Sequence, residues 1–278
     1  MDGVSRGVED AARAWAADSD LSVTKGSESD MASALTQGGL AYVITAVEAP
    51  WVTDPATIEA GVQGIVLVSD GAEPRPFLST LGGRESRWDE AGFLAGVLAG
   101  WAGEGSRAVG LVEAEGVAQP QADLAAGFDQ GVRYACPGCR VVRQAASAFD
   151  ATAFVVEGAQ AVFVSSGPEA VPAAERVAES GLWVVWLGEL PPGFPIVRVA
   201  GRIRFAPEAL VGQALQALAD GRSGESWPFS VGSGSLVFAD LQPDIISPGR
   251  QRLVQLAWDK LARGELELKV IEERGPGD

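Results

Sequence analysis

Few residues in this sequence could carry chemistry, and the missing types are as informative as those present. The sequence has no histidine, so it lacks a Ser-His-Asp triad, a Cys-His pair and any histidine-ligated metal site. Its only lysines are Lys25, Lys260 and Lys269, which leaves little room for lysine-based catalysis. Carboxylate chemistry remains, with Asp150 and Glu189 as its candidates. We therefore expect no enzyme, no cofactor and no bound metal.

The two cysteines form the motif Cys136-Pro137-Gly138-Cys139. A redox-active C-x-x-C opens a helix after a strand, whereas this motif falls in a predicted turn between a helix and a strand at residues 141–142. A zinc site needs about four ligands, and the sequence has no second cysteine pair. We expect a structural disulfide formed in an oxidising compartment. A redox or metal-binding role is the alternative.

The overall composition limits the class of partner. The chain has 278 residues, 47% of them hydrophobic, and a net charge of −16. This length suffices for two lobes of ordinary domain size. Because nucleic acids and anionic lipids attract basic surfaces, the acidity argues against both as main partners, although solubility alone explains the charge equally well.

Export and membrane signals are missing from the sequence. No apolar run reaches the ~18 to 20 residues of a membrane span, and the residues after Met1 lack the apolar stretch of a signal peptide. The chain also opens on a helical pattern, although a parallel α/β lobe normally begins with a strand. We expect that an export segment and the first strand lie upstream of Met1.

Predicted helices alternate with short apolar strands along the chain. Helical spacing or helix-end signals mark residues 2–17, 30–37, 90–101, 121–134, 169–180, 207–220 and 248–263. Apolar runs predict strands at residues 21–23, 40–47, 64–69, 108–112, 159–164, 182–187 and 266–271. This alternation predicts parallel sheets joined by right-handed crossovers.

The alternating pattern falls into two runs, which indicate two lobes. The segments that look like crossings between them are residues 77–87, 196–205 and 231–238. We predict an α/β fold of two Rossmann-like lobes, in which the N-terminal lobe comprises residues 1–83 and 204–232. The C-terminal lobe comprises residues 84–203 and 233–278. On the helix at residues 90–101, glycine recurs every fourth residue, which we interpret as close packing against a sheet.

Seven segments share, in order, the pattern of one protein family. They are EAGFLAGVLAG at residues 90–100, QP at 119–120, AGFDQGV at 126–132, SAFD at 147–150, GAQAVF at 158–163, SSG at 165–167 and RGELEL at 263–268. Their order and spacing resemble the basic membrane protein (BMP) family of substrate-binding lipoproteins, which includes purine-nucleoside receptors of ABC importers. The resemblance implies a type I periplasmic-binding-protein fold that holds its ligand between two lobes. It also implies an extracytoplasmic protein with a lipid anchor upstream, and a purine nucleoside as ligand.

The same resemblance carries over three candidate ligand contacts. The family's aromatic-asparagine pair at the first strand-helix junction reads Val4-Ser5 here, so the ring that stacks on the base is lost. Glu189 stands where the family has an aspartate that holds ribose hydroxyls, and Arg204 stands where it has a lysine. Ser5, Glu189 and Arg204 are therefore candidates.

Positions after strands add further candidates, because ligands of open parallel sheets bind at the carboxyl ends of strands. Trp51 can stack on a planar ligand or pack against its own lobe. Ser165, Ser166 and Gly167 let a ligand approach the backbone, or form a plain strand-to-helix turn. Trp88 either faces the cleft or belongs to the cap of its helix.

Charged residues near the same strand ends have two interpretations each. Arg202 and Arg204 share one face of an extended segment. They either bind an anionic or carbonyl-bearing ligand or form salt bridges with acidic neighbours. Asp150 is either a ligand contact or a helix cap. Trp186 lies inside a strand, where a core position is favoured.

Together these features predict an extracytoplasmic solute-binding protein. It holds a small molecule, works with an ABC transporter permease, binds no nucleic acid, and contacts the membrane only through an upstream lipid anchor. The first alternative is a ligand-sensing regulatory lipoprotein without a transport role. The second is an α/β enzyme that uses carboxylates.

Overall fold

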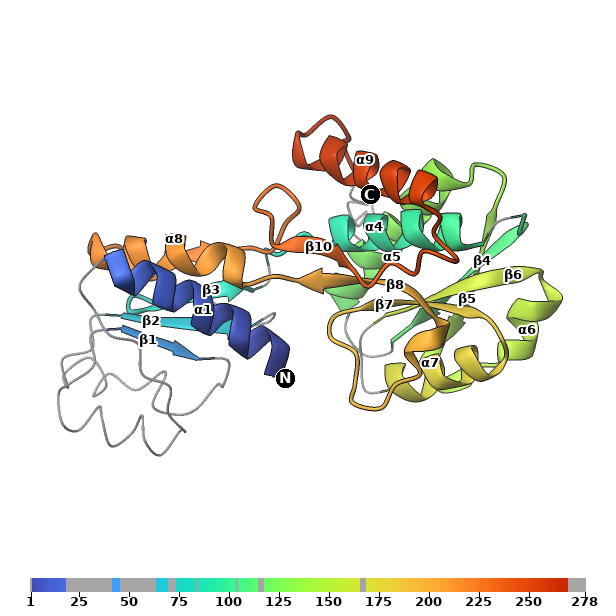
Figure 1. Ribbon diagram of the computed structural model, residues 1–278, viewed down its shortest axis with the longest axis horizontal. Helices are drawn as coiled ribbons and strands as arrows, with labels where there is room; N and C mark the ends of the chain where they lie inside the picture. The colour runs from blue at the N-terminus through green and yellow to red at the C-terminus, as the bar shows by residue number, and fades with distance from the viewer. Residues whose placement is uncertain are drawn as a thin grey trace, which may run out of the picture. The chain divides into compact units, whose positions relative to one another are not determined.

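A computed structural model describes residues 2–18, 42–45, 64–69, 74–83, 85–103, 105–114, 118–165 and 169–269 (Figure 1). The chain divides into two compact units, Met1–Ser86 with Ala206–Ser235, and Arg87–Phe205 with Leu236–Asp278. Each unit combines helices with a sheet whose strands are mostly parallel. The predicted strand at residues 21–23 and the predicted helix at residues 30–37 lie outside the described residues.

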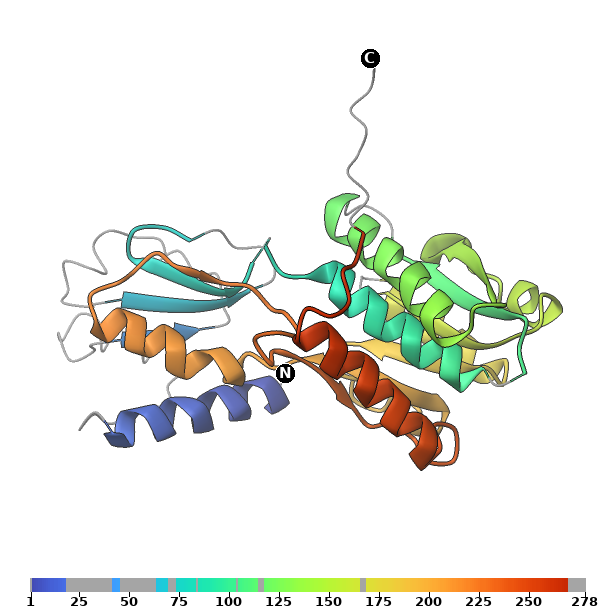
Figure 2. The same cartoon turned by 90° about the horizontal axis from the view of Figure 1, so that it is seen from above.

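The first unit is built on a sheet in which four strands are described. In sheet order these are β1 (Tyr42–Thr45), β2 (Gly64–Ser69), β3 (Leu78–Gly82) and β9 (Ser226–Trp227), and all neighbours pair in parallel. Helices α1 (Asp2–Asp18) and α8 (Glu208–Ala219) lie side by side along this sheet (Figure 2). Trp15 of α1 and Tyr42 of β1 meet edge to face, with ring centroids 5.9 Å apart.

The position of β3 corrects one expectation. Residues 77–87 looked like a crossing because they are rich in glycine and polar residues, yet residues 78–82 form a fully buried strand. The fully buried Ser79 and Thr80 are tolerated because they are hydrogen-bonded. The Ser79 hydroxyl accepts from the Glu225 amide at 3.3 Å, and the Thr80 hydroxyl lies 3.5 Å from the Ser226 hydroxyl, to which it donates. The chain leaves the first unit only after Ser86.

The second unit is built on a larger sheet, in which six strands are described in the order β10-β8-β7-β6-β4-β5. Their bounds are β4 (Ala108–Glu113), β5 (Arg140–Ala145), β6 (Ala159–Val164), β7 (Trp183–Leu187), β8 (Val199–Phe205) and β10 (Leu236–Ala239). All neighbours are parallel except β10, which runs antiparallel to β8. The segments at residues 196–205 and 231–238, expected to be crossings, therefore contribute strands to this sheet before and after the chain changes unit.

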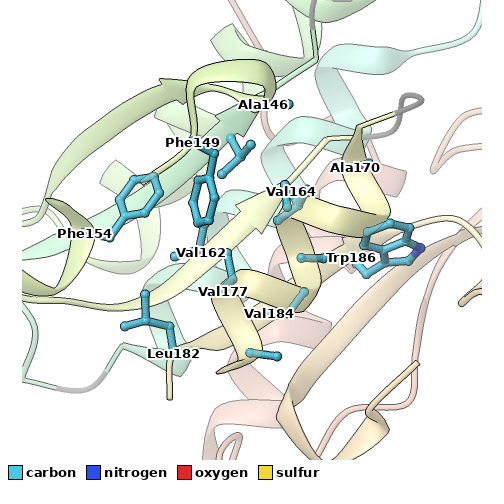
Figure 3. Packing of buried hydrophobic residues seen from close by; sticks show 14 of the residues in the cluster. Ala146, Phe149, Phe154, Val162, Val164, Ala170, Val177, Leu182, Val184 and Trp186 are labelled. Atoms are coloured by element: carbon cyan, nitrogen blue, oxygen red, sulfur yellow. The ribbon is translucent and has the colours of Figure 1, made fainter. Parts of the chain in front are cut away.

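Helices cover both faces of the second sheet. They are α4 (Trp88–Ala102), α5 (Ala118–Ala135), α6 (Ala151–Val156), α7 (Ala170–Glu179) and α9 (Pro248–Ala262), with short 3-10 turns η2 (Ala146–Ala148) and η3 (Ile196–Arg198). On one face, α6 and α7 enclose a hydrophobic cluster that includes Phe154, Val177 and Trp186 (Figure 3). The Trp186 and Phe194 rings lie 5.8 Å apart in it. Trp186 is thus a core residue, as expected.

The C-terminal strand that we predicted at residues 266–271 is absent over residues 266–269. The backbone of Lys269 is bonded to a side chain instead of to a neighbouring strand. The Gln130 amide group donates to the Lys269 carbonyl at 3.1 Å and accepts from the Lys269 amide at 2.9 Å. Residues 270 and 271 lie outside the described part.

Helices α4 and α5 pack with their backbones in contact, and glycine makes this possible. A Cβ atom added at Gly92 or Gly96 would lie 1.9 or 2.2 Å from a carbonyl oxygen of α5. A Cβ atom added at Gly127 or Gly131 would lie 2.0 Å from a carbonyl oxygen of α4. The glycine repeat of α4 therefore faces helix α5, and our expectation that it faces a sheet is wrong.

A disulfide joins Cys136 to Cys139, with Cα atoms 5.4 Å apart, in the turn from α5 to β5. The Cys139 amide donates to the Cys136 carbonyl at 3.0 Å, so the turn is also held by its backbone. Among the helices that the structure describes, none has the length and apolar character needed to cross a membrane.

We expect the Cys136→Ser, Cys139→Ser double variant to lose about 2 kcal/mol of unfolding free energy, the chain-entropy value for a loop of about four residues. Urea unfolding monitored by circular dichroism measures the change. The wild-type protein with reductant should lose the same amount. A loss above about 4 kcal/mol would mean that the disulfide holds more than its own turn.

Candidate functional site

The carboxyl ends of the second unit's parallel strands bring several candidate residues to one edge of the sheet. β6 ends at Val164 and is followed by Ser165, while β7 ends at Leu187 and is followed by Gly188 and Glu189. Because β6 and β7 are neighbours in the sheet, these turns lie next to one another. This edge is the location that the parallel topology favours for a ligand.

Ser165 joins two strands at this edge. Its amide donates to the Val112 carbonyl at 3.0 Å, and its hydroxyl accepts from the Ala114 amide at 2.8 Å. The side chain is buried. These contacts fix the ends of β4 and β6 relative to each other, so Ser165 shapes the edge whether or not it touches a ligand.

Glu189 belongs to an ion network. The Arg202 guanidinium of β8 lies 2.6 Å from Glu189 Oε2 and donates to the Gly188 carbonyl at 3.3 Å. Its Nε donates to Asp240 Oδ2, just past the end of β10. Burial lowers the pKa of Arg202, but its hydrogen bonds and attraction to Glu189 and Asp240 outweigh burial and raise the pKa above its usual value. Arg202 is therefore a permanent cation with two acidic partners.

Sequence reasoning missed Asp240 entirely. It follows β10, whose antiparallel register with β8 pairs Ala239 with Arg202. Its positive φ of 53° is unusual for a residue other than glycine. The distance of 38 residues between Arg202 and Asp240 in the chain leaves no local signal, and only the sheet topology brings them together.

A second charged group lies at the start of α4. Arg87 donates two hydrogen bonds to Asp89, at 2.9 and 2.7 Å, and lies 3.1 Å from Glu90. The Asp89 and Glu90 side chains are only 7% and 8% exposed. The hydrogen bond to Asp89 raises the pKa of Arg87, burial opposes this, and the charges of Glu90 and Asp89 add to the rise. Arg87 is thus the ionic partner of two buried acids at the beginning of the helix.

Trp88 lies within the same helix start and packs against β8. Its ring meets the Phe205 ring edge to face, with centroids 5.3 Å apart, and the residue is 8% exposed. Its indole Nε1 is buried and has no hydrogen-bond partner among the residues that the structure describes. Trp101 Nε1, in the last turn of α4, is in the same situation. Buried indole N–H groups normally find an acceptor.

The other candidates are placed as follows. Arg204 lies on the same face of β8 as Arg202, and its Nη1 lies 3.5 Å from the Phe205 carbonyl. Asp150 caps α6 by accepting from the Thr152 amide at 2.9 Å, which favours the cap interpretation. Ser5 lies within α1. Trp51, Ser166 and Gly167 lie outside the described residues.

The arrangement can hold a polar molecule. Glu189 and Arg202 lie by the carboxyl end of β7, and the Trp88 ring packs on Phe205 at the carboxyl end of β8. Among the described residues, no group of histidine, cysteine, aspartate or glutamate side chains could hold a metal ion. Ionic contacts, hydrogen bonds and packing are the interactions that the described residues offer.

Comparisons with known proteins give the fold. No family model and no curated protein matches the sequence. An ABC transporter solute-binding protein from Conexibacter woesei is 17% identical, with coverage of 95% of this chain and 93% of that chain and a TM-score of 0.66. Another, from Aeropyrum pernix, is 16% identical, with coverage of 97% and 90% and a TM-score of 0.61. The chain has a type I periplasmic-binding-protein fold.

Proteins of more than one function share this periplasmic-binding-protein fold. A transcriptional activator of the comK gene from Bacillus halodurans is 14% identical to the chain, with coverage of 94% of both chains and a TM-score of 0.65. At such low identity, the similarity extends to the fold alone. The fold class predicted from the sequence, two α/β lobes with parallel sheets, is confirmed.

Proposed function

We propose that this protein is an extracytoplasmic solute-binding protein of the BMP type that binds a small molecule for an ABC importer. The observation that supports this most is the shared fold, which runs across almost the whole of this chain and of two ABC transporter solute-binding proteins. The polar and aromatic groups at the carboxyl edge of the second sheet are suited to holding such a solute. An upstream lipid anchor is part of the proposal.

A purine nucleoside is the ligand that we propose first. Its support is the order of family-like segments along the chain, together with Glu189, whose carboxylate suits a ribose diol. Mass spectrometry of small molecules released from the purified, denatured protein tests this directly. We expect a nucleoside or another small solute in stoichiometric amount. Chemical change of a bound compound during incubation would instead favour the enzyme alternative.

A regulatory role is the second candidate, because the transcriptional activator from Bacillus halodurans shares the fold at similar coverage. Both candidates require ligand binding, and only the first requires a permease. Uptake of the labelled ligand into cells with and without the gene separates them. Loss of uptake supports the transport role, and unchanged uptake supports the sensor.

Trp88 gives the sharpest test of where the solute binds. We expect Trp88→Phe to weaken solute binding about 3- to 10-fold, which corresponds to one lost hydrogen bond of about 0.5–1.5 kcal/mol. The unpaired indole N–H is the donor that the solute would use. Phenylalanine keeps the edge-to-face contact with Phe205, so the ligand-free variant should remain folded. Isothermal titration calorimetry measures the affinity.

Trp101→Phe is the matched control, because its indole N–H is also buried and unpartnered among the described residues but lies at the other end of α4. Its affinity should equal that of the wild-type protein. Equal losses in the two variants, or no loss in Trp88→Phe, would remove Trp88 from the solute site.

A further inference from the structure

An open groove follows the solvent-facing side of helix α8 in the first unit. Helix α1, which lies beside α8 (Figure 2), borders it, as do residues between the end of α8 and β9. All of its lining residues belong to the first unit, whereas the candidate solute edge belongs to the second. Its volume of about 800 Å³ falls within the range of ligand pockets, about 300–1,000 Å³. The groove is thus large enough for a ligand of its own.

The groove is longer than a single six-membered ring. Along α8 its lining extends from Glu208 to Gln216. At a rise of 1.5 Å per residue, this part of the helix is about 12 Å long. A chain of two or more rings therefore fills the groove better than one ring does.

The lining carries no net charge, although the whole chain has a net charge of −16. Among the described residues that line the groove, the charged ones are Glu208 and Arg222, which have opposite signs. Arg222 donates to both carboxylate oxygens of Glu225, at 2.6 and 2.8 Å, and lies 3.8 Å from Asp220. An anionic ligand would find this cation already paired with acids, so the groove is suited to a neutral ligand.

Two amide side chains at the groove can donate and accept hydrogen bonds. Gln213 is exposed, and its side chain forms no hydrogen bond within the described part of the chain. Gln216 accepts from Trp15 Nε1 at 3.4 Å and donates to Asp220 Oδ1 at 2.9 Å, which leaves one of its two N–H donors for a ligand. Hydroxyl groups also both donate and accept, so they are matching partners for these amides.

Two tryptophans supply much of the apolar surface of the groove. Trp15 of α1 is held by its edge-to-face contact with Tyr42 and by its hydrogen bond to Gln216. Trp227 of β9 is partly exposed, and its indole N–H has no hydrogen-bond partner among the described residues. A tryptophan has an apolar ring and one N–H donor at its edge. A sugar ring offers the complement, with C–H groups on its faces and hydroxyls around its rim.

We propose that the groove along α8 binds a neutral oligosaccharide. Trp15 and Trp227 pack against the C–H groups of the sugar rings, while Gln213 and Gln216 hydrogen-bond to the hydroxyls. This site is separate from that of the proposed solute, because it uses residues of the first unit alone. The inference therefore goes beyond the proposed function and does not depend on it.

Titration of the wild-type protein with neutral trisaccharides tests the inference. Cellotriose, maltotriose and triacetylchitotriose are the probes, each compared with its own monosaccharide by isothermal titration calorimetry and tryptophan fluorescence. We expect at least one trisaccharide to bind at millimolar concentration or below, about 5-fold more tightly than its monosaccharide, the effect of one further hydrogen bond. Binding of none of these trisaccharides overturns the inference, whereas the proposed function is judged separately by the co-purified solute.

Gly212→Arg tests whether the trisaccharide occupies this groove. A Cβ atom added at Gly212 would meet no atom within 4 Å, so the variant should fold, and its long side chain would fill the groove. We expect its affinity for the trisaccharide to fall about 10-fold or more, because the ligand and the arginine compete for the same space. Gly249→Arg is the matched control, since Gly249 is also a helical glycine with open space around it but lies in the second unit. Its affinity should be unchanged.

Gln213→Ala gives a second readout that leaves the shape of the groove open. It should weaken trisaccharide binding about 3- to 10-fold, as expected for one lost hydrogen bond. Unchanged affinity in Gly212→Arg would mean that the trisaccharide binds at the solute site, which overturns this inference and leaves the proposed function intact. Sedimentation analysis covers the other occupant of such a groove. A wild-type dimer that Gly212→Arg dissociates, without any bound trisaccharide, would assign the groove to a second copy of the chain and would also overturn the inference.

Discussion

Gly131→Ala should lower the free energy of unfolding by about 3 kcal/mol, the upper part of the range for overpacking a core. The added methyl group would lie 2.0 Å from the Phe93 carbonyl oxygen and 2.9 Å from the Val97 amide nitrogen. Both are backbone atoms of α4, which cannot rotate away as a side chain can. Helix α4 is buried along nearly its whole length, so it has little freedom to shift. Urea unfolding monitored by circular dichroism measures the loss.

Gly249→Ala is the matched control for this variant. Gly249 is also a helical glycine of the second unit, at the start of α9, and an added Cβ atom would meet no atom within 4 Å. Alanine there should be neutral or should stabilise the protein by up to about 1 kcal/mol through its helix propensity. Equal effects in the two variants would show that helix propensity, not the contact between α4 and α5, decides the outcome.

Arg87→Met should lower the free energy of unfolding by about 2 to 3 kcal/mol. Removal of one partner from a buried ion pair costs about 3–5 kcal/mol, because the remaining charge is uncompensated. We reduce that figure because 45% of the Arg87 side chain is exposed to screening solvent. Asp89 and Glu90 would both lose this partner at the start of α4. Thermal and urea unfolding measure the change.

Arg263→Met controls for the loss of an ordinary surface ion pair. Arg263 and Glu265 approach to 2.7 Å with more than half of each side chain exposed. Such pairs contribute about 0–1 kcal/mol, so this variant should stay close to wild type. A loss in Arg87→Met no larger than in Arg263→Met would mean that Asp89 and Glu90 are stabilised without Arg87, for instance by the N-terminus of the helix.

The fold class could be predicted from the sequence, because the residue patterns that indicate its helices and strands are local. Apolar runs such as residues 64–69 and 159–164 correspond to strands β2 and β6 with the same bounds. β3 was missed because its sequence, LSTLG, mixes polar residues with a glycine. The buried hydroxyls of Ser79 and Thr80 are acceptable in the core because Glu225 and Ser226 supply their hydrogen-bond partners. Such long-range compensation leaves no trace in a local pattern.

The candidate site was harder to predict from the sequence, because its contacts also join residues that are far apart in the chain. Glu189 and Arg202 were each singled out by their position, but their ion pair depends on the register between β7 and β8. Asp240 was not considered, because its place is set by an antiparallel strand that the alternating pattern does not indicate. The glycines of α4 were recognised as a packing signal, whereas the identity of their neighbour, α5, depends on tertiary structure.

Strand β9 of the first unit comes from a distant part of the chain, and this affects how the unit folds during synthesis on the ribosome. β9 pairs with β3, yet residues 83–225 are synthesised between them. At about 5–20 residues per second, this delay is on the order of ten seconds. Helix α4 through strand β8 emerge within that time as one contiguous segment. We therefore expect the nascent chain to assemble most of its second unit first, while the unfinished edge of β3 attracts chaperones.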